Sequence, residues 1–423
     1  MAISTQRSLA QLKDEANKLG LLVTQTGKRE GKTDYVLALR NYYLSEEYPD
    51  GVPQALDLML QMESPMLCAQ SKHLPEIEMN HIWTSKDWIA EEKIDGCRFV
   101  SYWGPTREEC NGFSRNISVK DFLPVSYKDN VYMPNVDYSK ITDRFLIDSE
   151  IICTNPQIST IMGSKGVVTE CQLQAVTALL AMEPSKSIEI QKNERAPLQL
   201  KVFDCLWWNG EWLTDKPYYE RVQYMLKAYA ELKNAGVNCE RPISTYSNKQ
   251  EFYKAILRRG GEGVVLKNVY SQYVASSNRS KTGFLKVKRT LSQALDLETG
   301  MGDSIDGWIS GYELATEGKG FEGLIGSIDV TVTVKRSDGT SYDHVIARVP
   351  NIDLETRKKM TSYNSDGEPI LNPSFYGKVV EVDGQSISAR EHRLQHPVLV
   401  RWRPDKTQFE CVLSESLILD NIL

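Results

Sequence analysis

Lys93 lies between two strand-like runs in the stretch WIAEEKIDGCRFVSYW, close to Asp95, Gly96 and Arg98. A free lysine has a pKa of about 10.4 and is a poor nucleophile at neutral pH. Nearby cations or a metal ion favour the neutral, reactive amine. Attack of such an amine on an α-phosphate, with pyrophosphate leaving, gives a covalent lysyl-nucleotide. Lys93 is therefore a candidate nucleophile if phosphate-binding groups lie beside it.

A pair of carboxylates follows on a later strand. In the run RFLIDSEIIC the side chains of a strand alternate between its two faces, so Asp148 and Glu150 share one face. Ile147 and Ile151 go to the other face, which is suited to a core. This strand is expected to present acidic groups on one side and an apolar surface on the other.

Three lysines and a further carboxylate are also tied to apolar strands. GGEGVVLKN places Glu262 before a strand that ends in Lys267, and GFLKVKR places Lys286 and Lys288 on one face with Phe284. Carboxylates hold Mg²⁺ and lysines neutralise phosphate oxygens. Together with Lys93, these residues predict a site for a polyphosphate with a divalent metal.

The elements that must position these residues divide the chain into parts. A length of 423 residues predicts two or three domains. From about Pro65 to Thr290, strand-like runs alternate with helices, which indicates an α+β domain. After about Ser292, short alternating runs such as GSIDVTVTVKR and YDHVIARV are separated by Gly, Asp and Pro turns, which predicts an all-β barrel or sandwich.

The first 43 residues form a smaller part with a different charge. Apolar residues at helical spacing predict two short helices, with Gly20 ending the first. Seven Lys or Arg against four Asp or Glu give this part a charge of +3, although the whole chain carries −6. The loop GKREGKT has three residues between its glycines where a phosphate-binding P-loop needs four, so we interpret it as a basic loop.

Composition excludes several other classes. No apolar run is long enough to span a membrane and no secretory signal opens the chain, so a cytoplasmic protein is expected. The eight cysteines are scattered without metal-ligand spacing, which predicts reduced, buried thiols.

Eight short segments, taken in order along the chain, resemble motifs of the ATP-dependent DNA ligases. EEKIDGCR is similar to the K-x-D-G-x-R nucleotidyltransferase motif, and PMLCA, before it, to the segment that opens the adenylation domain. GFSRN, FLIDSEIIC, LKVFDCLWWNGEWL, EGVVLKN, FLKVKR and VRWRPDKT resemble the later motifs, with Ser149 where glycine is usual. The resemblance covers about Pro65 to Lys406.

The resemblance implies three domains. It places a nucleotidyltransferase (adenylation) domain with antiparallel sheets at 65–291 and an all-β OB-fold at 292–423. Residues 1–45 resemble the helical SAP module, which binds DNA, and 46–64 are expected to be a linker. The overall class is α+β.

It also implies a role for each motif residue, with ATP and Mg²⁺ or Mn²⁺ as cofactors. Lys93 carries AMP, Glu91 reads the adenine, Phe203 lies against it, and Glu150 and Glu262 bind the metal. The other nucleotide-binding residues are Arg98 and Arg115, toward the ribose and phosphate, and Lys267, Lys286 and Lys288, toward phosphates. Arg401, Arg403, Asp405 and Lys406 act in self-adenylation, and Lys28, Arg29 and Lys32 contact DNA.

The expected partner is nicked duplex DNA, in which an RNA strand is also conceivable, and the expected state is a monomer. Three other functions stay open at this point. An RNA ligase and an mRNA-capping guanylyltransferase share the lysyl-nucleotide chemistry, and a nucleic-acid scaffold would need none of it. An NAD-dependent ligase is disfavoured because the chain lacks a four-cysteine zinc site. Asp95 has an alternative role in the turn itself, and Phe203 has one as a core aromatic.

Overall fold

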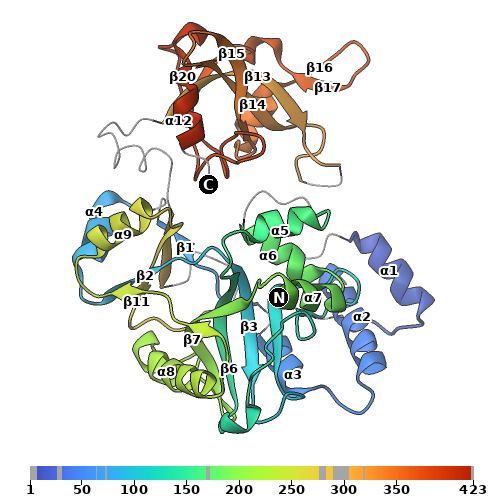
Figure 1. Cartoon of the computed structure of the whole chain (residues 1–423). Coiled ribbons are helices and arrows are strands. Elements are labelled where there is room, and N and C mark those ends of the chain that lie inside the picture. The colour runs from blue at the N-terminus through green and yellow to red at the C-terminus, as the bar shows by residue number, and fades with distance from the viewer. Residues whose placement is uncertain are drawn as a thin grey trace. The chain divides into compact units, whose positions relative to one another are not determined.

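A computed structural model describes residues 7–25, 31–62, 64–71, 74–167, 172–275, 283–288, 304–317 and 320–420 (Figure 1). The chain divides into two compact units. The first contains 1–249 and 265–287, and the second contains 250–264 and 288–423.

A mainly antiparallel seven-stranded sheet is the centre of the first unit. Its strands run in the order β5-β4-β3-β6-β7-β8, and β9 pairs with β7 in parallel. Their bounds are β3 Cys97–Trp103, β4 Asn111–Ile117, β5 Pro124–Ser126, β6 Phe145–Cys153, β7 Leu198–Trp208, β8 Glu211–Trp212 and β9 Cys239–Glu240. In the register of β3 against β6, Arg98 pairs with Glu150 and Val100 with Asp148.

The two faces of this sheet carry different cores. Ile147 and Ile151 belong to a cluster with four helices: α5 Ile158–Ser164, α6 Gln172–Ala181, α7 Pro184–Asn193 and α8 Tyr218–Asn234. Val100 and Leu146, on the other face, pack with α3 Gln54–Met62 and with Phe284. The alternation expected for β6 is therefore confirmed, and Asp148 points away from the helical layer.

A second, five-stranded sheet supplies the remaining motif strands. Its order is β1-β12-β11-β2-β10, with β1 parallel to β12 and β10 antiparallel to β2. The bounds are β1 Ala69–Gln70, β2 Trp88–Glu92, β10 Ser244–Thr245, β11 Gly263–Asn268 and β12 Phe284–Lys288. Helices α4 Glu76–Thr84 and α9 Lys249–Arg258 complete this part of the chain.

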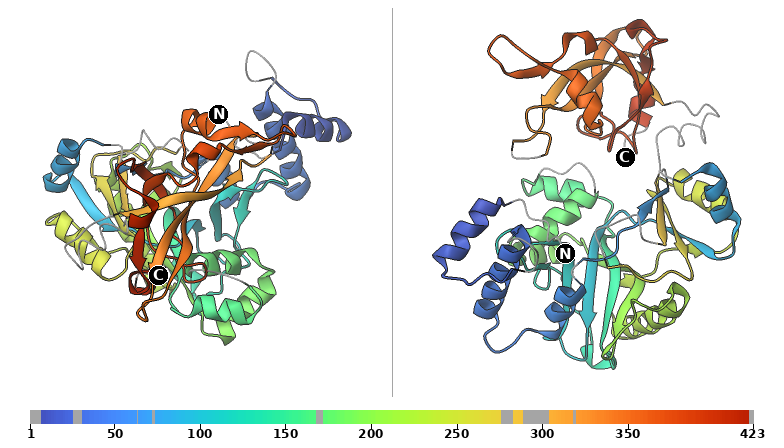
Figure 2. Two further views of the ribbon diagram at one scale, coloured as in Figure 1. Left: turned by 90° about the horizontal axis from the view of Figure 1, so that it is seen from above. Right: turned by 180° about the vertical axis from the view of Figure 1, so that it is seen from behind.

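The first two helices lie side by side within the first unit (Figure 2). α1 Leu9–Lys18 ends just before Gly20, whose φ of +66° fits the predicted stop, and α2 is Lys32–Glu47. Leu12 and Leu39 pack in one cluster with Phe122 from the sheet domain. The predicted linker at 46–64 contains helix α3, which the sequence analysis did not anticipate. This helix buries an apolar face in the core.

The second unit is rich in β-structure, as predicted. Its six-stranded sheet has the order β15-β14-β13-β18-β19, with β20 beside β14. The bounds are β13 Ile305–Leu314, β14 Ile325–Lys335, β15 Ser341–Val349, β18 Val379–Asp383, β19 Val398–Trp402 and β20 Val412–Ser414. Helices α11 Leu354–Met360 and α12 Glu415–Asp420 and the hairpin β16 Thr361–Tyr363 and β17 Pro369–Leu371 were not anticipated from sequence.

Two expectations about composition can be compared with the structure. Among the described residues, no helix has the length and apolar character needed to cross a membrane. Seven cysteines in the described ranges are free thiols; five are buried, and Cys68 and Cys97 are half-buried. Cys171 lies outside the described residues.

A fully buried ion pair fixes α8 to β7. Arg221 donates from Nε and Nη2 to the two carboxylate oxygens of Asp204, at 2.9 Å each. Its Nη1 donates to the backbone oxygens of Lys216 and Ser271. Both side chains of the pair are 0% exposed, so removal of one partner leaves an uncompensated charge in the core.

We therefore expect Arg221→Met to lower the free energy of unfolding by about 3–5 kcal/mol. Lys233→Met, on the same helix, breaks a half-exposed pair with Glu240 and is expected to cost less than about 1 kcal/mol. Urea unfolding of both variants checks the difference. Equal, small losses would show that the buried pair contributes little.

The turn before β3 tolerates no side chain at Gly96. A Cβ there would lie 2.7 Å from Ile152 Cγ2 and 2.8 Å from the backbone oxygen of Ile151. The turn therefore depends on a close approach of β6, and this contact holds the Lys93 loop against the sheet.

Gly96→Ala is expected to destabilise the protein by about 1–3 kcal/mol, because the added methyl group overpacks a site bounded by backbone. Gly163→Ala in α5 is the control: its Cβ meets nothing within 4 Å, so the change is neutral or stabilising by up to about 1 kcal/mol. Thermal unfolding of both variants compares them. An unchanged melting temperature for Gly96→Ala would rule out the close approach.

Candidate nucleotide-binding site

Lys93 lies in the loop that joins the two sheets of the first unit. β2 ends at Glu92 and β3 begins at Cys97. The Lys93 side chain is half-buried and Asp95 is exposed. The sequence therefore places the candidate nucleophile at the point where one sheet passes into the other.

Four predicted cations gather around the thiol of Cys68. Burial raises the pKa of this thiol, and the charges of Arg98, Lys267, Lys93 and Lys286 oppose that shift. These four residues come from β3, β11, the loop after β2 and β12, and Cys68 directly precedes β1. Elements that are far apart in the sequence thus bring positive charge to one place in the first unit.

Arg98 is held by a carboxylate on the neighbouring strand. Its Nε and Nη2 donate to the two carboxylate oxygens of Asp148, which is 0% exposed. The guanidinium carbon also lies 5.1 Å from the ring centre of Phe203. Asp148 therefore fixes the direction of Arg98, a role that the sequence analysis did not assign to it.

Tyr273 is the third member of a hydrogen-bonded clamp made of Arg98, Asp148 and Tyr273. Its hydroxyl donates to Asp148 Oδ2 at 2.6 Å and accepts from the Met66 backbone nitrogen at 3.0 Å. Arg98 Nη2 in turn donates to the Met66 backbone oxygen at 3.1 Å. Burial and the Asp148 carboxylate raise the pKa of Tyr273 well above its usual value, so the hydroxyl stays protonated and able to donate.

Glu91 and Lys267 form a buried pair beside Phe203. Lys267 Nζ lies 2.5 Å from Glu91 Oε1, and the two side chains are 2% and 9% exposed. Burial raises the pKa of Glu91, and Lys267 opposes that shift. Lys267 was predicted to contact phosphates, but here its ammonium group is directed at the Glu91 carboxylate.

Glu150, Arg115 and Asp95 act together on a second thiol. Burial raises the pKa of Cys97, a hydrogen bond with Thr177 lowers it, and the charges of Glu150, Arg115 and Asp95 act on the same group. Arg115 is exposed on β4 and Glu150 is half-buried on β6. Three more motif residues are thus neighbours around the start of β3.

Glu262 and Lys288 are partners within the second unit. Lys288 Nζ lies 2.7 Å from Glu262 Oε1, and the Glu262 side chain is 4% exposed. Among the described residues, no three His, Cys, Asp or Glu side chains are placed to hold a metal. Mg²⁺ commonly takes one or two carboxylates together with substrate phosphates. The expected roles of Glu150 and Glu262 as metal ligands stay predictions.

The C-terminal motif residues are held by two acidic residues from neighbouring strands. Asp306 of β13 pairs in register with Glu381 of β18. Asp306 accepts from Arg403 and Lys406, and Glu381 accepts from Arg401 at 2.5 Å. The sequence analysis missed both acids.

Within the motif, Arg403 also donates to both oxygens of Asp405, at 3.1 and 2.9 Å. These hydrogen bonds lower the pKa of the Asp405 carboxyl to about 2. Arg403 is therefore shared between a neighbour in the motif and the acids of the sheet.

Part of the basic loop GKREGKT lies outside the described residues. Lys28 and Arg29 fall in the segment 26–30, whereas Lys32 is the first residue of α2. Their expected contacts with DNA stay predictions.

The residues that sequence reasoning missed are mostly the partners of the predicted ones. Asp148, Tyr273, Asp204, Asp306 and Glu381 hold the motif residues or the strands that carry them. A single acid inside an otherwise apolar strand, as in KVFDCLWW or KVVEVDG, was an available signal, because a buried carboxylate requires a partner.

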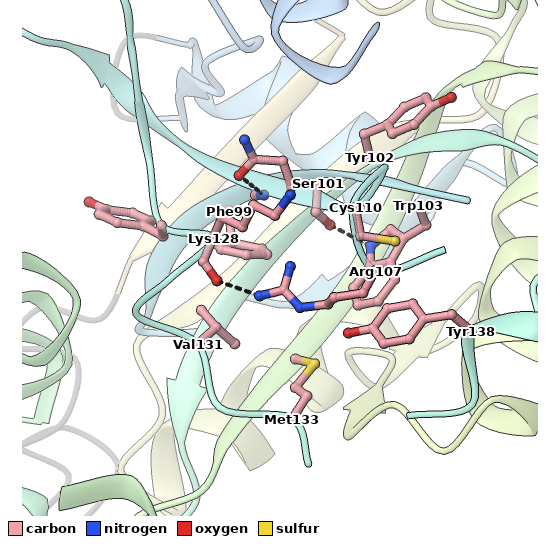
Figure 3. Close-up of a pocket in the computed structure, with 13 residues that line it drawn as sticks. Phe99, Ser101, Tyr102, Trp103, Arg107, Cys110, Lys128, Val131, Met133 and Tyr138 are labelled. Atoms are coloured by element: carbon pink, nitrogen blue, oxygen red, sulfur yellow. Dashed lines mark hydrogen bonds between the residues drawn. The ribbon is translucent and has the colours of Figure 1, made fainter. Parts of the chain in front are cut away.

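A pocket lies beside β3 and is lined by residues of this strand and of the segments that follow it (Figure 3). It has a volume of about 60 Å³ and is lined by Phe99, Trp103 and Tyr138, among others. Arg107 borders it and donates to the Lys128 backbone oxygen at 2.9 Å. None of its lining residues is a predicted nucleotide-binding residue. The pocket is therefore separate from the cationic cluster.

Comparison with known proteins identifies a family. The model of the family "ATP dependent DNA ligase domain" matches residues 65–288, more than half of the chain. A DNA ligase of Vaccinia virus (strain Ankara) is 29% identical over 363 residues, 78% of this chain and 58% of that protein. A DNA ligase of Ignicoccus hospitalis is 22% identical over 343 residues, 75% of this chain and 53% of that protein. The chain thus spans about half the length of these curated relatives.

Among solved structures, the ATP-dependent DNA ligase of bacteriophage T7 in complex with ATP aligns with 80% of this chain and 98% of its own. Its identity is 16% and its TM-score 0.33, too low to support a structural argument. The family match rests on sequence, and it spans the segment that contains Lys93, Arg98 and Glu262. This chain belongs to the family of the ATP-dependent DNA ligase domain.

Proposed function

We propose that this chain is an ATP-dependent DNA ligase that joins a 5′-phosphate to a 3′-hydroxyl at a nick through a lysyl-AMP intermediate on Lys93. The observation that carries the proposal is the position of Lys93 between Glu91 of β2, paired with the buried Lys267, and Arg98 of β3, held by Asp148. The charges of Arg98, Lys93 and Lys286 also act on the neighbouring Cys68 thiol. Cations at this position suit the phosphates of a nucleoside triphosphate, whose α-phosphorus Lys93 would attack.

The first step forms a bond between Lys93 Nζ and the α-phosphorus and breaks the bond to the β-phosphate oxygen. Pyrophosphate leaves and the amine loses a proton to solvent. The surrounding cations favour the uncharged amine that can attack. Arg98, held by Asp148 and Tyr273, orients the ribose and phosphate, because such transfers depend on positioning and electrostatic stabilisation.

Two further transfers complete the reaction. The 5′-phosphate oxygen at the nick attacks the lysyl-AMP phosphorus and frees Lys93. The 3′-hydroxyl then attacks the 5′-phosphorus, a phosphodiester bond forms, and AMP leaves. Each step exchanges one phosphorus–oxygen or phosphorus–nitrogen bond for another.

Two other groups of residues support these steps. Glu150 and Glu262 would hold Mg²⁺, which neutralises developing charge on the phosphates when bound. We assign the C-terminal β-rich part to an OB-fold whose Arg401, Arg403, Asp405 and Lys406 assist self-adenylation. Asp306 and Glu381 hold the Arg401, Arg403 and Lys406 side chains by hydrogen bonds.

Lys93→Arg is expected to abolish nucleotide attachment, because a guanidinium keeps its charge and cannot attack. The measurement is a denaturing gel after incubation with α-labelled ATP and Mg²⁺, followed by a chase with nicked DNA. Wild type is expected to gain a label that nicked DNA discharges.

Lys86→Arg, an exposed lysine seven residues earlier in the same region, is the control and should label normally. Label from GTP alone would indicate a capping-type nucleotidyltransferase, and discharge only by nicked RNA would indicate an RNA ligase. Either result, or the absence of label on wild type, would contradict the proposal.

We also infer that the N-terminal helices add a DNA-binding surface of the SAP type. α1 and α2 pack with Phe122, which is 1% exposed, and with Ile117 of β4. The basic loop between the helices is therefore attached to a docked helical pair. Lys28, Arg29 and Lys32 are placed at or next to the start of α2 in sequence, where contacts to phosphates are sequence-independent and depend on salt.

Replacing Lys28, Arg29 and Lys32 together by Gln is expected to weaken binding of nicked DNA by about tenfold or more at low salt and to flatten the dependence of affinity on salt. Self-adenylation should be unchanged, because the loop lies outside the family segment at 65–288. Fluorescence anisotropy over a salt series measures the first effect and the labelling gel the second.

A triple Gln variant of Lys186, Lys192 and Lys227, exposed on α7 and α8, removes the same charge and is the control. If both triple variants weaken binding equally, the effect is one of net charge and the loop has no special role.

A further inference from the structure

Lys267 is enclosed by aromatic rings. The residue is 1% exposed, and its Nζ lies 4.9 Å from the ring centres of Phe203 and Tyr218 and 5.1 Å from that of Phe284. Cation–π contacts of this kind stabilise an ammonium that has lost its water. The Lys267 ammonium group is thus enclosed in the interior of the first unit.

The hydrogen bonds of Lys267 are also fully used. Its Nζ meets Glu91 Oε1 at 2.5 Å, the Tyr218 hydroxyl at 3.2 Å and the Phe203 backbone oxygen at 3.4 Å. An ammonium has three N–H donors. These three acceptors account for all of them, so none is left for a phosphate oxygen.

The residue that Lys267 stabilises is Glu91. A buried carboxylate is unstable without a counter-charge, and Glu91 is 7% exposed. It lies on β2, two residues before the candidate nucleophile. Lys267 supplies the counter-charge for this carboxylate and fixes the position of one of its oxygens.

We propose that Lys267 is a positioning residue that sets the preference for a 6-aminopurine nucleotide by fixing the Glu91 carboxylate. A carboxylate only accepts hydrogen bonds. The amino group on C6 of adenine donates to it, whereas the oxygen on C6 of guanine faces it as a second acceptor. The inference rests on the proposed function, in which Glu91 reads the base.

This role and direct contact with phosphate predict different results. All nucleoside triphosphates carry the same three phosphates, so loss of a phosphate contact weakens the binding of ATP and of GTP equally. Loss of the fixed carboxylate weakens ATP selectively. The ratio of the two nucleotides is therefore the quantity to measure, with KM and kcat separated.

The test compares Lys267→Met with wild type in the full chain, using labelled ATP and GTP in the lysyl-nucleotide assay. Methionine keeps much of the side-chain volume among the three rings and removes the charge. We expect the preference for ATP in kcat/KM to fall by about tenfold or more, mainly through a higher KM for ATP. An equal loss for both nucleotides would overturn the inference.

Two further variants guard against a general loss of structure. Glu91→Gln removes the buried negative charge, and Glu91→Gln/Lys267→Met replaces the pair by neutral groups. Because Lys267 acts through Glu91, the double variant should show the same nucleotide preference as Glu91→Gln alone. A further fall in the double variant would also overturn the inference.

The two levels of the proposal can fail separately. Absence of label on wild type with either nucleotide would contradict the ligase function itself. A wild type that labels with ATP, together with a Lys267→Met variant of unchanged preference, would contradict only the role of Lys267.

Discussion

The buried ion pair between Arg98 and Asp148 is the interaction on which the rest of the site depends. It joins β3 to β6, and through Tyr273 and the Met66 backbone it reaches two segments more than a hundred residues apart in sequence. Asp148 is fully buried, so loss of either partner leaves a charge that the core cannot solvate. The pair therefore sets both the packing of the sheet and the direction of the guanidinium. Arg98, which the motif predicts to bind substrate, is therefore also part of the hydrogen-bonded core of the first unit.

Other charged motif residues are also paired with carboxylates. Lys267 is paired with Glu91, Lys288 with Glu262, and Arg403 with Asp306 and Asp405. Each of these cations therefore has a local carboxylate counter-charge. In the proposed function, polyphosphate binding adds anions to charged groups that are already ordered. This preorganisation is what transfer of a phosphoryl group requires, because little of the barrier is removed by covalent help from the protein.

Much of the fold could be predicted from sequence where a local rule, such as strand alternation, applies. Alternation placed Ile147 and Ile151 in the helical core and Asp148 on the other face, and the turn-separated runs after Ser292 became strands of the β-rich unit. Partners could not be predicted in this way. Tyr273 meets Asp148 across 125 positions, and a lysine at the end of a strand, such as Lys267, has the same pattern whether it faces a phosphate or a buried carboxylate. Helix α3 was missed because its short apolar run was interpreted as a connection, although it packs in the core.

The most direct test of this account is a double-mutant cycle on the clamp, with the rate of lysyl-nucleotide formation measured for Asp148→Asn, Tyr273→Phe and the double variant. The Tyr273 hydroxyl donates to Asp148 at 2.6 Å and accepts from Arg98 Nη2 at 3.3 Å, so the three residues act as one unit. The account predicts that each single change slows the reaction and that the double variant loses less than the product of the two single effects. Effects that multiply would show two independent contributions. That result, or an Asp148→Asn variant as fast as wild type, would contradict the claim that this pair holds the site together.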